Sequence, residues 1–477
     1  MLKDSKSNSW LAFTLFVIVS ISTVQHWNKF NLDIQGKHAW RQSATMWNVR
    51  NYVRHDSNIL NPRLSHFNGG KDNIVRLEFP LMQWLLSKVM LVFGEHIVTA
   101  RLFMFGVSIL STLGMYQLFR SFFRDNRLSL IASLFFSNSP LFFYYAVNPL
   151  PDALALCFGI WYLVLLNLYE QKKCRKWLWL SCALLCLSAL CKLPFILFSS
   201  VSLLLMRRQI DYRRLLEIGA VHLIFVLPVV LWYSWVIPTW GPSPVLGGIL
   251  KYGIDLSTLE EYARYHLSTM FPHIIMSPIS FILFIYGLIS LNGARDIEWV
   301  KWLAAASVMY LILEINAIGK VHDYYMLPFL PWIFIIMAQG VKRIYNLYPQ
   351  LIYLCLAVQL IYTPKATEVR WSVDDHIINS EIYLNNEELK DAVPSDALCI
   401  ILNDPSMVMF SYQIDKMGFV FDSDHLPIEW IDDLRENYNV RYMYSDSELI
   451  NNDVEVLSRI CKELYVAGRI KVFQFCE

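Results

Sequence analysis

The chain has 477 residues, of which 55% are hydrophobic and only 17% are charged. Soluble domains carry about 25% charged residues, so the composition excludes an ordinary soluble protein. The net charge of +1 is unevenly divided: residues 1–363 hold 31 Lys+Arg and 18 Asp+Glu, a balance of +13, whereas residues 364–477 hold 10 and 22, a balance of −12. The two parts therefore belong to different environments. Basic residues stand in short loops between apolar runs, which argues against a nucleic-acid partner.

Apolar runs recur along the first part of the chain and predict eleven membrane spans. The first begins too near Met1 to be a cleaved signal peptide and is interpreted as a retained helix. The predicted spans are 10–27, 97–119, 128–147, 152–169, 177–191, 193–206, 215–238, 273–291, 299–317, 325–340 and 348–363.

The segment Phe79–Phe93 is apolar but short, and it either spans or lies in the membrane interface. If it is interfacial, the loops on the N-terminal side hold the basic clusters, including Arg208 and Arg295. The opposite short loops then hold only Lys192 and Lys320. Positive charge marks the cytoplasmic side, so the N-terminus is expected in the cytoplasm and the C-terminus outside.

This topology predicts a transmembrane domain, 1–363, and a small extracytoplasmic α/β domain, 364–477. Two large loops face outward, 28–96 and 239–272. In the C-terminal part, 397–402, 440–444 and 470–475 have strand patterns, and 428–438 and 455–468 have amphipathic helix patterns. Three cysteines, Cys399, Cys461 and Cys476, permit one disulfide and leave one over.

Titratable, polar and aromatic residues that could take part in a reaction gather on the predicted outer side. The first outer loop begins with Asp33, His38, Arg41 and Gln42, which are functional candidates because polar and titratable residues are held there at a membrane surface beside apolar spans. The alternative is a solvated loop with interfacial anchors. Later outer turns add further candidates. They are Glu78 in LEFP, Asp152 in NPLPD, Lys192 in KLPF, and His322 and Tyr325 in GKVHDYYMLP. For the two acids among them the alternative is an ordinary helix start, and for the pair in the last turn it is an aromatic belt with a helix cap.

Acids, cations and aromatic residues on one side of a membrane match the needs of a reaction on a membrane-anchored phosphate. Cations neutralise the leaving phosphate, and a carboxylate takes a proton from an incoming hydroxyl.

The order of these motifs resembles bacterial membrane glycosyltransferases of the GT-C fold, of the glycosyltransferase family 39 type. That group is related to the protein O-mannosyltransferases and the aminoarabinose transferase of lipid A. The matching stretches lie in residues 30–335 and are LDIQGKHAWRQSAT, RNY, EFPLMQWL, FGEH with ARL, SPLFFYYAVNPLPDAL, KLPF and HDYYMLPFLP.

The resemblance implies an inverting transfer from a polyprenyl-phosphate sugar to an acceptor hydroxyl, on a glycan, lipid or protein. It implies an acid in the first outer loop as the base and basic residues in later loops as phosphate ligands. We therefore expect Asp33 to be the base, with His38 as the alternative. The chain departs from the pattern at two positions. Mannosyltransferase relatives have an Asp-Glu pair just after the first span, whereas here Asp33 is followed by Ile34. Many relatives with the HxWRQ signature have an acid two residues after the Gln, whereas this chain has Ala44.

The remaining roles follow the same scheme. Arg41, Lys192 and His322 are expected to bind the lipid phosphate, with Gln42 and Tyr325 as further substrate contacts. Glu78 and Asp152 are expected to shape the acceptor side or bind a divalent ion. The expected location is a bacterial inner membrane.

Two other functions fit a polytopic membrane protein. A transporter or flippase for lipid-linked sugars is disfavoured, because the sequence shows neither repeated halves nor polar residues at mid-depth. A polysaccharide polymerase or ligase is disfavoured, because the candidate residues begin directly after the first span.

Overall fold

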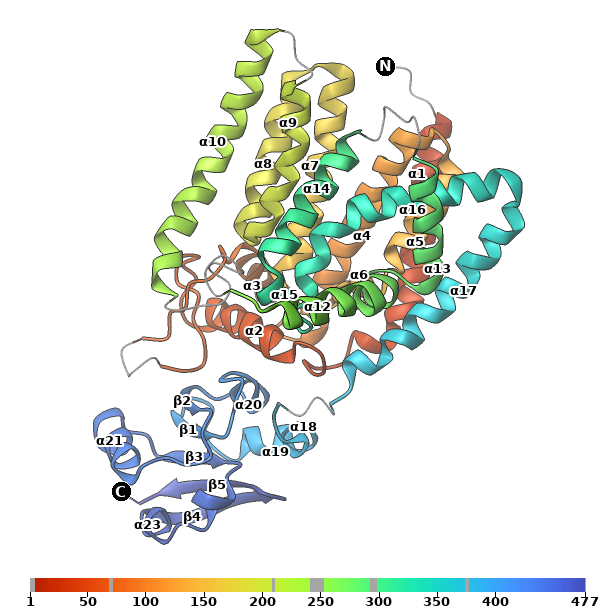
Figure 1. Ribbon diagram of the computed structural model, residues 1–477. Helices are drawn as coiled ribbons and strands as arrows, with labels where there is room; N and C mark the ends of the chain where they lie inside the picture. The colour runs from red at the N-terminus through yellow and green to blue at the C-terminus, as the bar shows by residue number, and fades with distance from the viewer. Residues whose placement is uncertain are drawn as a thin grey trace. The chain divides into compact units, whose positions relative to one another are not determined.

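The computed structural model describes residues 5–67, 72–207, 211–240, 253–291, 298–373 and 377–476 (Figure 1). Arg208, Arg295 and positions 241–252 of the second predicted outer loop lie outside these residues. The chain forms two compact units. Unit 1 comprises residues 1–31, 77–82 and 98–368, and unit 2 comprises residues 32–76, 83–97 and 369–477.

Unit 1 is helical (Figure 1). Its α-helices are α1 Ser5–His26, α4 Ile97–Phe123, α5 Asn126–Ser137, α6 Pro140–Tyr145, α7 Pro151–Lys172, α8 Arg175–Cys191, α9 Ser200–Arg207, α10 Tyr212–Val236, α12 Leu256–Tyr265, α13 Pro278–Ile289, α14 Glu298–Leu313, α15 Ile315–Ile318, α16 Leu330–Leu347 and α17 Pro349–Thr367. Its 3-10 helices are η1 Trp27–Lys29, η3 Leu193–Ser199, η4 Ile237–Thr239 and η7 Asp323–Phe329. A π-helix, η5, comprises His266–Ile275.

Within the described residues, five helices are long and apolar enough to cross a membrane. Two further helices, Leu256–Ile275 and Pro278–Ile289, are bent by 109° at their junction. If they count as one span, the number of candidate spans is six. The five are Ser9–Lys29, Ile97–Phe123, Pro151–Lys172, Tyr212–Thr239 and Asp323–Leu347. The multi-pass helical architecture is thereby confirmed, while the count of eleven spans stays a prediction.

The predicted span 128–147 is divided into α5 and α6. Ser139 caps α6 and Pro140 occupies its first turn, a combination that starts a new helix. The carbonyl of Asn138 at the break accepts hydrogen bonds from Gln359 Nε2 (2.6 Å) and Thr363 Oγ1 (2.7 Å) of α17. These side chains supply the partners that a broken backbone needs in an apolar environment.

Unit 2 contains α2 Ala39–Arg54, most of α3 Leu81–Phe93, and a five-stranded sheet. The strands are β1 Cys399–Leu402, β2 Gly418–Phe421, β3 Tyr442–Ser445, β4 Ile460–Ala467 and β5 Ile470–Phe475. Their order is β2-β1-β3-β5-β4, with β1 parallel to β2 and β3, and β5 antiparallel to β3 and β4. The accompanying helices are α18 Ser380–Leu384, α19 Asn386–Asp391, α20 Met409–Gln413, α21 Ile428–Tyr438, α22 Glu448–Asn451 and α23 Val454–Leu457.

The α/β pattern of the C-terminal part is confirmed in all but one element. All four residues of β1 are buried, as expected of a central parallel strand, and α21 has the predicted bounds. The predicted helix at 455–468 is wrong, because this segment holds the short α23 and then strand β4. Pairing with β5 and a covalent link override its helical pattern.

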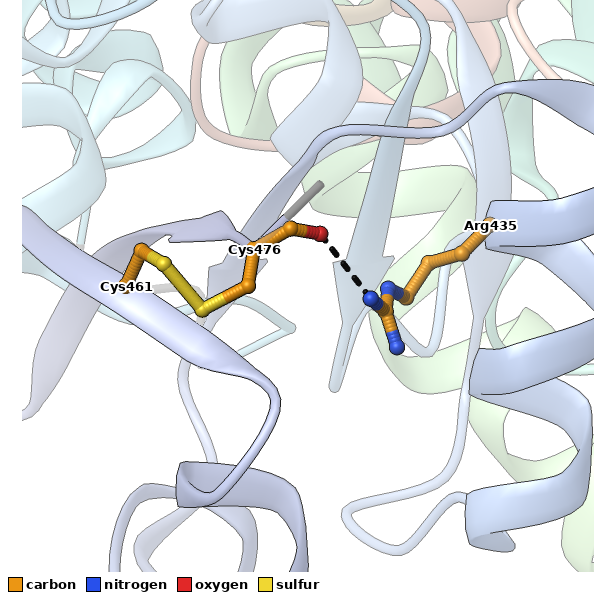
Figure 2. The surroundings of a disulfide bond; sticks show 3 residues. All are labelled: Arg435, Cys461 and Cys476. Carbon is orange, nitrogen blue, oxygen red and sulfur yellow. Dashed lines mark hydrogen bonds between the residues drawn. A yellow bond between two sulfur atoms is a disulfide. The ribbon is translucent and has the colours of Figure 1, made fainter.

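A disulfide joins Cys461 in β4 to Cys476, which follows β5. Figure 2 shows the carbonyl of Cys476 accepting a hydrogen bond from Arg435 Nη2 of α21 (2.9 Å). The disulfide and this bond hold Cys476 against both strand β4 and helix α21. Cys399, the cysteine left over, is buried in β1.

A loop of residues 55–67 joins the sheet at its other edge. Gly418, the first residue of β2, donates its backbone N–H to Ser65 O (3.0 Å), and Phe67 N donates to Gly418 O (3.2 Å). Ser411 Oγ also donates to Ser65 Oγ (2.7 Å). The loop thus covers an edge that would otherwise expose unpaired backbone groups.

Candidate functional site

The α7–α8 hairpin in unit 1 positions a carboxylate and an ammonium group beside each other. Asp152 is in the first turn of α7, and Lys192 follows the last residue of α8. Acids are favoured at a helix N-terminus and cations at a C-terminus, and α7 packs along α8. Lys192 Nζ lies 3.8 Å from Asp152 Oδ1, and the two side chains are 11% and 1% exposed. This distance makes an ion pair but exceeds an ordinary hydrogen bond.

Aromatic rings surround the Lys192 ammonium. Its Nζ lies 5.5 Å from the ring centre of Tyr324 and 4.9 Å from that of Tyr325, which are distances of cation–π contacts. His322, at the start of η7, stacks edge-on against both rings. Its Nδ1 is 3.1 Å from Tyr324 Oη. Three predicted substrate ligands, Lys192, His322 and Tyr325, are therefore brought together, with Asp152 beside them.

A buried hydrogen bond fixes η7 against α6. Tyr145 Oη donates to Asp323 Oδ1 at 2.6 Å, and both residues are almost fully buried. A short bond to a carboxylate is stronger than a neutral one. It holds the neighbouring Tyr324 and Tyr325 in place, although neither Tyr145 nor Asp323 stood out as a site residue in the sequence.

Glu78 is placed by the backbone on either side of it. Phe79 N donates to Leu190 O near the end of α8 (3.0 Å), and Trp232 Nε1 of α10 donates to Leu77 O (3.2 Å). Glu78 is 7% exposed. The two predicted acceptor-side acids thus lie around the same end of α8.

A buried arginine supports the turn before α7. Arg101 of α4 is fully buried and donates from Nη1 to Asn148 Oδ1 (2.6 Å) and to Val147 O (3.3 Å). Asn148 Nδ2 in turn donates to Tyr144 O (2.7 Å). Arg101 therefore helps to orient the NPLPD turn that carries Asp152. The signal that could have identified it is a charge near the start of an apolar span.

In unit 2, the predicted base Asp33 contacts the C-terminal part of the chain. Its Oδ1 accepts a hydrogen bond from the backbone N–H of Ile34 (2.6 Å) and one from Tyr412 Oη of α20 (3.3 Å). Gln413 Nε2 donates to Ile34 O (2.8 Å), and the Arg50 guanidinium lies 4.0 Å from the Tyr412 ring centre. Helix α20 thus orients the segment that carries Asp33.

The other first-loop candidates begin α2. His38 is the N-cap residue with a left-handed backbone (φ 57°), and its carbonyl accepts from Arg41 N and Gln42 N. Gln42 Nε2 donates to Lys37 O at 3.1 Å. His38, Arg41 and Gln42 are all buried, so this HxxRQ turn is a packed structure and not a solvated loop.

An ion-pair cluster holds α2 to two other segments of unit 2. Arg54 donates to both carboxylate oxygens of Asp415 (2.8 and 2.9 Å) and of Glu95 (2.6 and 3.0 Å). Burial raises the pKa of Asp415. The hydrogen bonds from Arg54 and the charges of Arg50 and Arg54 outweigh that effect and hold this pKa below its ordinary value.

In the described part of the chain, no group of three or more His, Cys, Asp or Glu side chains is placed to hold a metal ion. The expectation that Glu78 and Asp152 bind a divalent ion stays a prediction.

A family model described as dolichyl-phosphate-mannose-protein mannosyltransferase matches residues 78–232, which is less than half of the chain. The match includes Glu78, Asp152 and Lys192. No curated protein sequence matches the chain.

Solved structures match over nearly the whole length. ArnT from Cupriavidus metallidurans bound to undecaprenyl phosphate aligns with a TM-score of 0.66 and 11% identity, covering 98% of both chains. The arabinofuranosyltransferase AftD from Mycobacteria aligns with a TM-score of 0.57 and 14% identity, covering 98% of this chain and 40% of that one. The oligosaccharyltransferase AglB from Archaeoglobus fulgidus, in complex with an inhibitory peptide and a dolichol-phosphate, aligns with a TM-score of 0.55 and 13% identity. This alignment covers 93% of this chain and 70% of that one. The chain therefore has the GT-C fold that its sequence motifs resemble.

Proposed function

We propose that the protein is a membrane glycosyltransferase that moves a sugar from a polyprenyl-phosphate donor to an acceptor hydroxyl. The match to the mannosyltransferase family model supports this function. So does the likeness in fold to ArnT, whose structure holds undecaprenyl phosphate. The proposed location is a bacterial inner membrane, with a cytoplasmic N-terminus and the C-terminal domain outside.

The observation that carries the proposal is the cluster of Lys192, His322, Tyr324 and Tyr325. Lys192 is mostly buried in an apolar helical unit, beside Asp152 and two tyrosine rings, and a buried charge in such a setting is a candidate for function. A lipid phosphate arriving from the bilayer offers it charge-assisted hydrogen bonds that are stronger than neutral ones. The surrounding rings accept the apolar part of such a lipid.

The proposed reaction assigns a role to each predicted site residue. The acceptor oxygen bonds to the anomeric carbon as the carbon–oxygen bond to the phosphate breaks, inverting the configuration. The acceptor proton passes to Asp33, or to His38 as the alternative base. The polyprenyl phosphate leaves with the electron pair, and Lys192, His322 and Arg41 balance its charge. Gln42 and Tyr325 contact the donor, while Glu78 and Asp152 shape the acceptor side.

The proposal is tested by removing the protein from its host and analysing the lipid extract by mass spectrometry. A transferase that is absent leaves its donor unused, so a polyprenyl-monophosphate-linked sugar is expected to accumulate. Returning the wild-type protein restores the normal level, whereas the Asp33→Asn and His38→Ala double variant does not. Accumulation of a diphosphate-linked oligosaccharide instead identifies a polymerase or ligase.

A transporter or flippase is distinguished with purified protein in nanodiscs. Nanodiscs have no separate compartments, so transport has no product there. Transfer of the accumulated sugar to an acceptor in this preparation supports the transferase, and its complete absence with every acceptor fraction of the host envelope contradicts it.

A further inference from the structure

The sheet of unit 2 carries a cavity of about 640 Å³ at the ends of two parallel strands. Asn403, directly after β1, and Asp446, directly after β3, both line it. From β1 the chain passes to β2 on one side of the sheet and then to β3 on the other. In open α/β sheets, ligands bind outside the carboxyl ends of strands where the strand order reverses in this way. The volume is in the range of small-molecule sites.

The cavity contains a fixed polar network around Asp446. This side chain is 2% exposed. Arg469 binds it in fork geometry, with Nε 2.7 Å from Oδ1 and Nη2 3.0 Å from Oδ2. Asn379 Nδ2 donates to Oδ1 (2.9 Å), and Asn403 Nδ2 donates to the backbone carbonyl of Asp446 (3.0 Å). A buried carboxylate satisfied by several donors forms a rigid polar surface.

The charge of the lining limits the kind of ligand. Asp446 and the exposed Glu448 bring two carboxylates, and Arg469 brings one cation that is already paired with Asp446. The surplus of negative charge disfavours phosphates, carboxylates and nucleotides. Amide, carboxylate and guanidinium groups together supply both donors and acceptors, and Ile377 and Pro405 add an apolar wall.

A ligand with many neutral hydroxyls on one side and C–H groups on the other fits this lining. We propose that the cavity binds an uncharged sugar unit. Its use as a docking site for a glycan acceptor rests on the proposed transferase function, whereas sugar binding itself does not.

The test uses the full-length protein in nanodiscs and saturation-transfer NMR with mannose, galactose and N-acetylglucosamine, and with glucuronate as the anionic counterpart. At least one neutral sugar is expected to receive saturation, and glucuronate is expected to receive clearly less. Replacing Asn403 and Glu448 by Ala is expected to weaken binding roughly five-fold or more, the loss of one or two hydrogen bonds. Glu448 is exposed, and Asn403 donates to the backbone carbonyl of Asp446 and not to its carboxylate, so the variant removes neither partner of the Asp446–Arg469 side-chain pair.

Glu455→Ala is the matched control, because Glu455 is an exposed acid of α23 that does not line the cavity. It is expected to bind as the wild type does. The inference is overturned if no neutral sugar binds, if glucuronate binds as well as the neutral sugars, or if the control and the cavity variant behave alike. Sugar transfer without sugar binding here refutes this inference alone, while sugar binding without any transfer activity refutes the proposed function alone.

Discussion

The carboxylate of Asp33 is held by a backbone N–H and by the Tyr412 hydroxyl, which is a suitable arrangement for a positioned base. We expect Asp33→Asn to lower the transfer rate by about 10²–10⁴-fold, the usual contribution of general-base catalysis, and to leave donor binding unchanged. Tyr412→Phe keeps the base and removes one hydrogen bond, so a loss of only a few-fold in kcat is expected. Rates measured with purified variants check both.

The same rate measurements distinguish Asp33 from His38 as the base. Near-normal transfer by Asp33→Asn together with abolished transfer by His38→Ala assigns the proton to His38. If both variants transfer normally, the first-loop mechanism is refuted for this protein, and Glu78 and Asp152 become the carboxylates to test.

The ion pairs of Asp415 predict a pH dependence of stability. Its folded-state pKa lies below the ordinary value of 3.8, so its stabilising effect is complete above that value and is lost as the pH falls through the folded-state pKa. Asp415→Asn is expected to cost on the order of 1 kcal/mol at pH 7, because solvent screens the partly exposed Arg54. The difference in Tm from wild type should shrink at pH 3. The exposed Asp396→Asn is the control, and a pH-independent difference for Asp415→Asn contradicts the account.

Some site residues were accessible to sequence reasoning and others were not. Lys192 stands out in the sequence because a lone lysine on the predicted outer side runs against the charge bias, and the structure places it buried beside tyrosine rings. Tyr145 and Tyr412 give no such signal. Their roles come from partners 178 and 379 residues away in the chain, which only the fold can bring together.

Helices α13 and α16 pack with their backbones in close contact at two glycines. A Cβ on Gly287 would lie 2.0 Å from Ile336 O, and one on Gly340 would lie 2.0 Å from Leu283 O. Small residues at such crossings allow close helix packing in membranes. Gly287→Ala and Gly340→Ala are each expected to destabilise the protein by roughly 1–3 kcal/mol, as overpacking does.

Gly106 of α4 provides the matched control, since a Cβ there would meet nothing within 4 Å. Gly106→Ala should leave the unfolding temperature unchanged or raise it slightly, because Ala favours helix over Gly. Thermal unfolding in detergent measures all three variants, and equal behaviour of Gly106 and Gly340 variants would disprove the packing argument.

Elements with one strong local pattern were predictable, and elements that depend on distant partners were not. The helix at 428–438 needs only its amphipathic spacing. Segment 455–468 has a comparable pattern, yet Ile460–Ala467 is a strand because β5 and the Cys461–Cys476 disulfide lie beside it. Similarly, hydropathy alone joins α5 and α6, whereas the Ser139–Pro140 cap divides them.

At the scale of the whole molecule, the charge bias predicts the orientation in the membrane. Reporter fusions at 170–176 and 207–214 are expected to report the cytoplasm, and fusions at 60–75 and after 370 the outer side. The control is a fusion at the N-terminus, which should report the cytoplasm. Inverted results after residue 97 would mean that Phe79–Phe93 crosses the membrane and that the proposed outer location is wrong.

The sequence indicates two environments but not how the chain is distributed between the two compact units. Opposite net charges separate residues 1–363 from 364–477. The structure groups residues 32–76 with 369–477, through backbone pairing of Ser65 with Gly418 and side-chain contacts such as Gln413 to Ile34. Such pairings leave no mark in local composition.

The most direct test of the central claim is the affinity of the purified protein for undecaprenyl phosphate. Native mass spectrometry or ligand competition should detect binding by the wild type. Lys192→Ala should weaken it by roughly 10- to 150-fold, since a charge-assisted hydrogen bond contributes about 1.5–3 kcal/mol. Lys320→Ala, which removes an exposed lysine paired with Glu261, should bind as the wild type does. Equal affinities of wild type and Lys192→Ala, or no binding by the wild type, would contradict the account.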